Sequence, residues 1–265
     1  MPESDGPVTV RTLAAMKKRG ERITMLTAYD YPTAQLLDRA GIDCLLVGDS
    51  LGMVVQGHKT TVPVTLDQII YHGEMVVRGA SRAMVVVDLP FPIGQVSVPH
   101  TLQCAARIMK ETQCQAVKME GGHQQSDAIR AMVDAGIPTI AHIGLRPQSV
   151  HALGGYRVQK DADGLMRDAL AAQGAGAFAV LIECVPAELA QTVTEKLTVP
   201  TIGIGAGPGC DGQVLVTNDM LGWNSGYIPK FVRQFADLNS LATDAVTAYR
   251  QQVRDGAFPG SKEAF

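Results

Sequence analysis

Four acidic residues stand at the ends of short apolar runs, where a parallel sheet would bring them together. The runs span 44–48, 84–87, 116–119 and 179–182, and the acids that end them are Asp49, Asp88, Glu120 and Glu183. Carboxylate oxygens are ligands that Mg²⁺ prefers, and one or two of them suffice because this ion keeps several waters. If the runs are neighbouring parallel strands, we expect Asp49 and Asp88 to reach one cation.

Three further features indicate the chemistry in which such a cation would take part. Lys118 lies two residues before Glu120, so the period-two alternation of a strand puts both side chains on one side. A lysine and a carboxylate that face one cavity fit an anionic substrate next to a metal ion. Glu183 ends a strongly apolar run, where burial would raise its pKa and suit it to act as a general base. His142 could donate to an oxyanion or only support the lumen.

Each acid also has a structural alternative. A single carboxylate after an apolar run can cap a helix or lie in a solvated loop. Glu183 could cap a helix that starts at Pro186, or pair with Lys118. The recurrence of acids after four separate runs favours one shared site over four unrelated caps. Asp30 follows the same rhythm, and we expect it to be structural.

The elements that must position these residues alternate between strand and helix. Apolar runs predict strands near 23–29, 44–48, 84–88, 116–120, 139–143, 179–184, 201–204 and 213–217. Helical periodicity predicts helices near 8–19, 32–40, 66–79, 99–112, 124–135, 162–173 and 186–197. We expect the first helix to cover the barrel floor and the connection between the last two strands to be short.

This alternation favours an α/β fold in which eight parallel strands close into a (βα)8 TIM-type barrel. We expect a single domain over residues 1–265, with the barrel core at about 22–220 and a C-terminal extension at about 221–265. The extension should contain helical segments near 231–236 and 240–254.

Composition agrees with one metabolic enzyme domain. The 265 residues are 46% hydrophobic, and a barrel of this type needs about 250 residues. The net charge of −3 gives no basic surface for nucleic acid, and no apolar stretch is long enough to span a membrane. The five cysteines form no CxxC pair, which favours free thiols in a reducing compartment. We therefore expect a cytoplasmic enzyme.

Several ordered motifs resemble the ketopantoate hydroxymethyltransferase family over about residues 8–260. They are Val47–Gly52, Val54–His58, Asp88–Phe91, Val117–Gly122, His142–Leu145, Pro147–His151, Gly154–Tyr156, Glu183–Pro186, Gly203–Gly207 and Tyr227–Phe231. The resemblance implies transfer of a hydroxymethyl group from 5,10-methylenetetrahydrofolate to 3-methyl-2-oxobutanoate (α-ketoisovalerate) through a Mg-stabilised enolate. The products would be ketopantoate and tetrahydrofolate, in pantothenate and coenzyme A biosynthesis. It also implies a large homo-oligomer, typically a decamer.

The resemblance assigns roles to positions of this chain. Asp49 and Asp88 would bind Mg²⁺, and Glu120 would complete its shell directly or through water. The residues that would contact the keto acid are Asp49, Ser50, Asp88, Lys118 and His142, and Glu183 would be the general base. The chain departs from the usual family pattern at Pro92–Gly94, Arg146 and Asn218, but none of these removes a proposed metal ligand or the base.

Two other functions remain as alternatives. A Mg²⁺-dependent lyase of the isocitrate-lyase or phosphonopyruvate type would share the barrel, but its characteristic Lys-Lys-Cys-Gly-His-like loop is missing from the sequence. A binding or scaffold protein could keep the barrel without activity. Such a protein has no need for an acid set together with Lys118 and Glu183.

Overall fold

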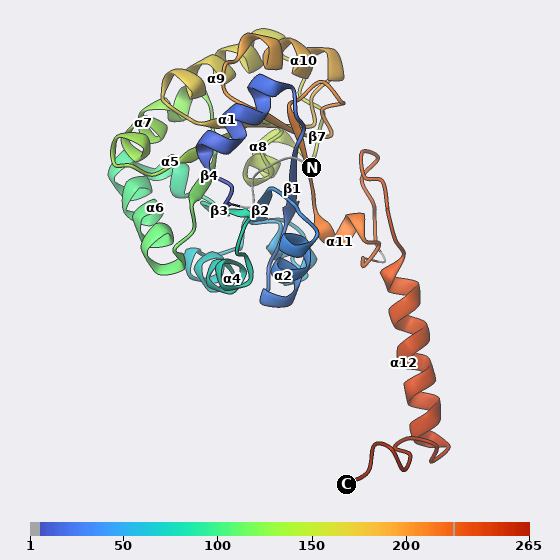
Figure 1. Ribbon diagram of the computed structural model, residues 1–265. Helices are drawn as coiled ribbons and strands as arrows, with labels where there is room; N and C mark the ends of the chain where they lie inside the picture. Colours follow the sequence, from blue (N-terminus) through green and yellow to red (C-terminus); the bar gives the residue numbers. More distant parts are fainter. Residues whose placement is uncertain (1–5, 225) are drawn as a thin grey trace. The chain divides into compact units, whose positions relative to one another are not determined.

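A computed structural model describes residues 6–224 and 226–265 and contains a closed parallel barrel (Figure 1). Within these residues the strands are β1 Ile23–Thr27, β2 Cys44–Val47, β3 Met84–Asp88, β4 Ala116–Glu120, β5 Thr139–Gly144, β6 Ala179–Glu183, β7 Thr201–Ile204 and β8 Gly212–Leu215. They pair in chain order, and β1 closes the barrel against β8. The prediction of a (βα)8 barrel is confirmed.

Helices surround the strands in the order that the sequence predicts (Figure 1). They are α1 Val10–Arg19, α2 Tyr31–Arg39, α4 Leu66–Gly79, α6 Val98–Thr112, α7 Ser126–Asp134, α9 Ala162–Gly174 and α10 Ala187–Lys196. Asp30 accepts a hydrogen bond of 2.8 Å from the Thr33 amide at the start of α2, so its expected structural role is confirmed. Within the described part of the chain, no helix is long and apolar enough to cross a bilayer.

The loops at the strand ends contain short helical turns that the sequence analysis did not predict. They are α3 Leu51–Val54, α5 Ile93–Val96, α8 Val150–Leu153 and the 3₁₀ turns η1 His123–Gln125 and η2 Pro147–Ser149. Each has at most four residues, which is too short for an amphipathic period to be visible in the sequence.

The helix α1 covers the floor of the barrel, as expected. Leu13 and Met16 join a core cluster with residues near the N-terminal ends of the strands, among them Ile23 and Met84. Lys17 in the last turn of α1 is 2.7 Å from the Asp211 carboxylate. The lower end of the barrel is therefore closed by apolar packing, which leaves the opposite, C-terminal ends of the strands for chemistry.

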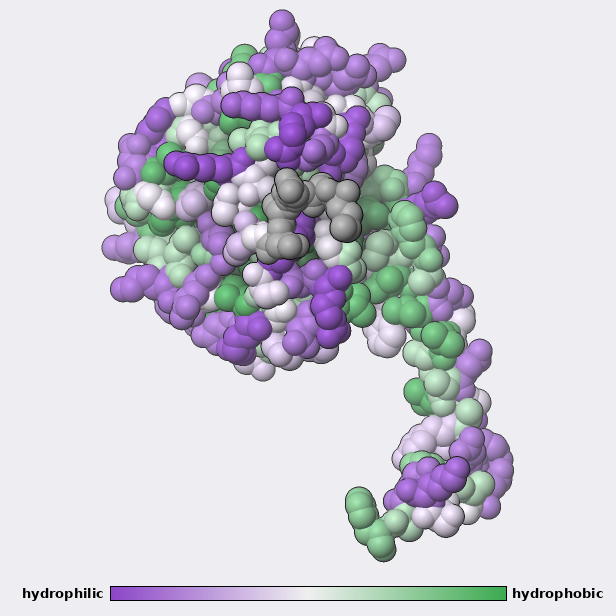
Figure 2. Space-filling model, viewed as in Figure 1, coloured by the Kyte–Doolittle hydropathy of each residue, from purple (hydrophilic) through white to green (hydrophobic). Residues whose placement is uncertain are grey.

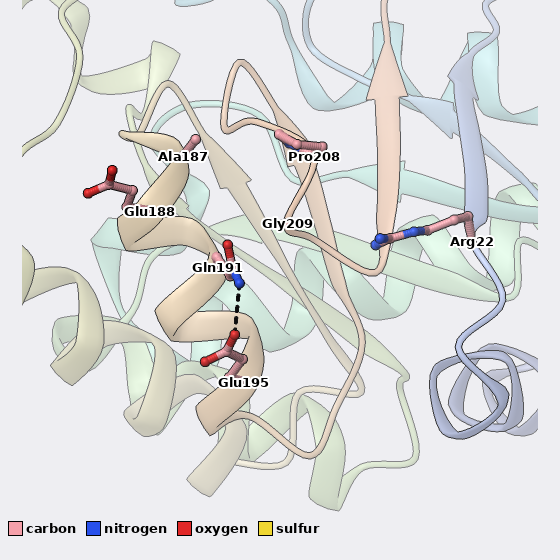
Figure 3. Close-up of a pocket in the computed structure, with 7 residues that line it drawn as sticks. All are labelled: Arg22, Ala187, Glu188, Gln191, Glu195, Pro208 and Gly209. Carbon is pink, nitrogen blue, oxygen red and sulfur yellow. Dashed lines mark hydrogen bonds between the residues drawn. The ribbon is translucent and has the colours of Figure 1, made fainter.

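The connection from β7 to β8 is short, as predicted, and the described residues form no helix in it. A Cβ atom on Gly207, whose φ is +75°, would collide with Ala187 at the start of α10. The outer surface beside this turn carries a pocket of about 420 Å³ (Figure 3). Its lining residues are Arg22, Ala187, Glu188, Gln191, Glu195, Pro208 and Gly209.

The chain divides into two compact units, Met1–Leu215 and Val216–Phe265. The second unit contains α11 Thr217–Met220 and α12 Leu238–Arg254, and α12 confirms the helix expected over 240–254. The helix expected over 231–236 is wrong. The amide of Phe235 donates to the carbonyl oxygen of Met220 at 2.8 Å. In a regular helix this amide would donate to the residue four positions before it. The predicted domain boundaries stay a prediction.

Candidate functional site

The sequence-predicted site residues gather at the C-terminal ends of β2 to β6. Asp88 and Lys118 are register partners on β3 and β4, and Glu120 and His142 are register partners on β4 and β5. Asp49 follows the end of β2. All five residues are at most 5% exposed, so their polar groups must find partners within the protein.

Asp88 forms the centre of the polar contacts. Its Oδ1 atom is 2.8 Å from Lys118 Nζ, and its Oδ2 atom accepts a hydrogen bond of 3.2 Å from the Asp49 amide. Lys118 Nζ is also 3.3 Å from His142 Nδ1. Lys118 and Glu120 face the same side of β4, as the period-two pattern predicts, because His142 Nδ1 is 3.9 Å from Glu120 Oε1.

The cluster contains three carboxyl groups and one ammonium group. Burial raises the pKa of Asp88 to about 7; Lys118 opposes the shift and Asp49 adds to it. Burial also raises the pKa of Asp49 and of Glu120. Burial lowers the pKa of Lys118, but the surrounding carboxylates outweigh that effect and raise it, so the ammonium stays charged. One lysine therefore faces three carboxylates.

This donor set fits a hard divalent cation. Among the described residues, Asp88 Oδ1 has no hydrogen-bond partner in good geometry, although Lys118 Nζ lies 2.8 Å away. No three His, Cys, Asp or Glu side chains within residues 6–224 and 226–265 are grouped as a complete protein-only metal centre. Mg²⁺ does not need such a group, because one or two carboxylates with water and substrate oxygens fill its shell.

Glu183 ends β6 on the other side of His142. Its Oε2 atom is 3.1 Å from His142 Nε2, and its side chain is 15% exposed. Burial raises the pKa of Glu183 to about 7, with Lys118 opposing. Helix α10 begins at Ala187 without a side-chain cap, and Lys118 pairs with Asp88. The alternatives of Glu183 as a helix cap or as the partner of Lys118 are therefore wrong.

His142 lies between the lysine and the glutamate as a neutral ring. Burial and the charge of Lys118 lower the pKa of His142 well below its ordinary value. Because a lysine ammonium can only donate, Nδ1 is the accepting nitrogen and the proton is on Nε2, which faces Glu183. Nε2 makes no hydrogen bond to a described residue, although Glu183 Oε2 is 3.1 Å away. Whether His142 donates to an oxyanion or only packs inside the barrel stays a prediction.

Ser50 is at the rim of the site, because its Oγ atom is 2.8 Å from the Tyr29 hydroxyl and it is only partly buried. The loop after β5 lies beside the same site. Both of its ends are bonded to β6 and the residue after it: the Leu145 amide donates to Glu183 O and the Gln159 amide to Cys184 O, each at 2.9 Å.

One residue in this loop was missed by the sequence analysis. Gln148 is buried, and its amide Nε2 is 2.9 Å from Asp49 Oδ2. It lies within the motif Pro147–His151, but it is on a 3₁₀ turn and has no periodic relation to the acids. The outer pocket beside α10 contains none of the residues of this cluster and is not the site.

Comparisons with known proteins show which family the sequence matches. The family model described as ketopantoate hydroxymethyltransferase matches residues 7–261. The 3-methyl-2-oxobutanoate hydroxymethyltransferase of Rhodopirellula baltica is 61% identical over 97% of this chain and 96% of its own length. That of Desulforapulum autotrophicum is 55% identical over 97% of this chain and 98% of its own length.

Solved structures match the fold alone. A phosphonopyruvate hydrolase solved with oxalate and Mg²⁺ aligns with a TM-score of 0.63 and 15% identity, over 96% of this chain and 92% of its own. A 2,3-dimethylmalate lyase of the PEP mutase/isocitrate lyase superfamily aligns with a TM-score of 0.60 and 18% identity, over 97% of this chain and 91% of its own.

Proposed function

The chain belongs to the ketopantoate hydroxymethyltransferase family, and we propose that it transfers a hydroxymethyl group to 3-methyl-2-oxobutanoate to form ketopantoate. The observation that carries this proposal is the buried mouth of the barrel. There a cluster of three carboxylates and a lysine lies on one side of neutral His142, and Glu183 with a raised pKa lies on the other. The first part suits a cation and an anionic substrate, and the second suits removal of a proton.

In this proposal Asp49 and Asp88 would hold Mg²⁺, and Glu120 would complete its shell directly or through water. When bound, Mg²⁺ would act as a Lewis acid that polarises the keto oxygen and stabilises the negative charge that develops there. Lys118 contributes a fixed positive charge beside the substrate carboxylate. Ser50 and His142 line the same space. The grouping of three buried carboxyl groups around one lysine supports this assignment.

Glu183 is the proposed general base. It takes the proton from C3 of the keto acid, and the electron pair of that C–H bond delocalises into the carbonyl group as an enolate. C3 then forms a bond to the one-carbon unit of 5,10-methylenetetrahydrofolate. The two C–N bonds that hold this unit break. Water supplies the hydroxyl oxygen, and the proton from C3 and one proton of water go to the two nitrogens of the released tetrahydrofolate. A carboxyl group with a pKa of about 7 is well matched to this proton transfer near neutral pH.

The proposal includes self-association and a cytoplasmic location. Val246, Tyr249 and Val253 share one face of α12 and are at least 45% exposed. Apolar side chains are visible along this segment in Figure 2. We propose that a second copy of the chain covers this face within a homo-oligomer, by family resemblance a decamer, which sedimentation would measure. The five free cysteines support a reducing compartment.

A lyase of the isocitrate-lyase or phosphonopyruvate type is the weaker alternative. Structures of that kind share the barrel at 14–18% identity, whereas the hydroxymethyltransferase relatives are 50–61% identical over nearly the whole chain. Low identity supports a common fold and no common reaction. A scaffold without activity is also disfavoured, because burying an acid cluster of this kind is costly without a ligand.

The test measures exchange of the C3 proton of 3-methyl-2-oxobutanoate in D₂O with Mg²⁺, followed by NMR. Glu183→Gln should slow exchange about 10²- to 10⁴-fold and leave Mg²⁺ affinity unchanged by calorimetry. Asp88→Ala should weaken Mg²⁺ binding. Glu188→Gln changes an exposed acid of α10 and is the matched control.

Normal exchange in Glu183→Gln would reject its role as base. A wild-type protein that makes no ketopantoate with the folate donor would reject the proposed function.

A further inference from the structure

Gln148 is the polar residue of the site whose role the proposed chemistry leaves open. It lies in η2, the turn that follows β5, and is 4% exposed. A buried glutamine must place its amide hydrogens on acceptors, because each unsatisfied polar group costs stability. The partners of this amide therefore indicate what the residue does.

Both hydrogens of the side-chain amide are used. Nε2 is 2.9 Å from Asp49 Oδ2 and 2.9 Å from the carbonyl oxygen of Leu89. Both partners can only accept, so the nitrogen, and not the oxygen, of the amide must face them. The orientation of the amide is thus fixed by chemistry. It joins the acid that follows β2 to the backbone that follows β3.

The backbone of the same residue holds a second acid. The amide N–H of Gln148 lies 3.2 Å from both carboxylate oxygens of Glu120 on β4. One residue of the β5 loop therefore supplies donors to two of the three clustered carboxylates, which are 28 and 99 residues away in the sequence.

We infer that Gln148 is a positioning residue that orients Asp49 and Glu120 for the divalent cation. The inference rests on the proposed function, because it assigns the purpose of these contacts to the metal of that reaction. The side-chain amide fixes Asp49 directly. The backbone N–H fixes the Glu120 carboxylate, which would complete the shell of the ion directly or through water. Partners of this kind hold metal-binding groups in orientation and tune affinity.

The test is calorimetric titration of the full chain with MgCl₂. Gln148→Met keeps the length and volume of the side chain. It removes the side-chain amide that donates to Asp49 and Leu89 and leaves the backbone N–H that faces Glu120. The Kd for Mg²⁺ should rise about 10- to 100-fold, the usual effect of losing such a partner. Gln115→Met is the matched control: Gln115 accepts a hydrogen bond of 2.8 Å from the Val85 amide, away from the cluster. Its Mg²⁺ affinity should equal that of the wild type.

Thermal unfolding followed by circular dichroism separates positioning from a merely structural role. Gln148→Met with a lowered Tm but wild-type Mg²⁺ affinity overturns the inference, and wild-type ketopantoate formation would then leave the proposed function intact. If Gln148→Met does not fold, Gln148→Asn takes its place with the same expectation, because its amide is one methylene too short to reach Asp49. A wild-type chain that neither binds Mg²⁺ nor forms ketopantoate overturns the proposed function and this inference with it.

Discussion

Lys118→Met should destabilise the barrel strongly, because it removes the positive charge from a buried acid cluster. Lys118 Nζ is 2.8 Å from Asp88 Oδ1, and the two side chains are 5% and 1% exposed, so water cannot replace the ammonium. Breaking a buried pair by removing one partner costs about 3–5 kcal/mol. Methionine preserves most of the apolar volume, so the loss reports mainly on charge.

The size of this loss should depend on pH. Burial raises the pKa of Asp88 to about 7 even with Lys118 present, and removal of the lysine raises it further. A carboxyl whose folded pKa exceeds its unfolded pKa of about 4 binds more protons when folded, so stability falls as pH rises through that window. The destabilisation should therefore be largest at pH 8 and clearly smaller at pH 5, where the folded variant protonates Asp88.

The assay is urea unfolding at pH 5 and pH 8, with and without MgCl₂, followed by far-ultraviolet circular dichroism. The single tryptophan, Trp223, lies in the second unit, so its fluorescence does not report on the barrel. Mg²⁺ should restore part of the stability at pH 8, by about 2.7 kcal/mol at a concentration of 100 Kd. Lys110→Met, on the exposed surface of α6, should stay within about 0.5 kcal/mol of the wild type. Equal destabilisation at both pH values would refute the reasoning.

Two other results are expected. The rate of C3 proton exchange should rise with pH to a plateau, with a midpoint near pH 7. The reason is that burial raises the pKa of Glu183 to about 7 and the base must be ionised. A flat rate profile between pH 5 and 8 would contradict this. Asp38→Ala should lower the free energy of unfolding by about 2–4 kcal/mol, because the donors on Ser81, Arg82 and Ala83 would lose the charged acceptor of their hydrogen bonds. Asp163→Ala, on the exposed surface of α9, is its control in urea unfolding, and equal losses would argue against the Asp38 network.

The fold was predictable because its signals are local. Eight apolar runs and the intervening amphipathic segments predict the order and type of the elements, and the period of two places Lys118 and Glu120 together. The segment 231–236 shows where local signals fail. Its pattern favours a helix, but the Phe235 amide donates to the carbonyl oxygen of Met220, the last residue of α11. A pattern of side chains carries no information about that backbone bond.

The contacts between the site residues were less predictable, because they depend on the register of neighbouring strands and on the loop after β5. That Asp88 faces Lys118, and that Glu120 faces His142, follows from which residues of neighbouring strands pair. The sequence shows the acids and not these pairs. Gln148 is harder still to predict, since the loop that carries it has no period and its partners are far away in the chain.

The neutral state of His142 explains how Asp88, in the proposed cation site, and Glu183, the proposed base, can lie at the same end of the barrel in different roles. A protonated ring would attract Glu183, 3.1 Å away, and lower the pKa that suits it to act as a base. Burial opposes protonation of His142, and Lys118 adds to this effect because its ammonium faces Nδ1 at 3.3 Å and repels a second positive charge. The same ammonium attracts Asp88 and opposes the effect of burial on it. Burial and one lysine therefore keep the imidazole neutral beside the proposed base, and the same lysine favours the ionised form of Asp88 where a cation would bind.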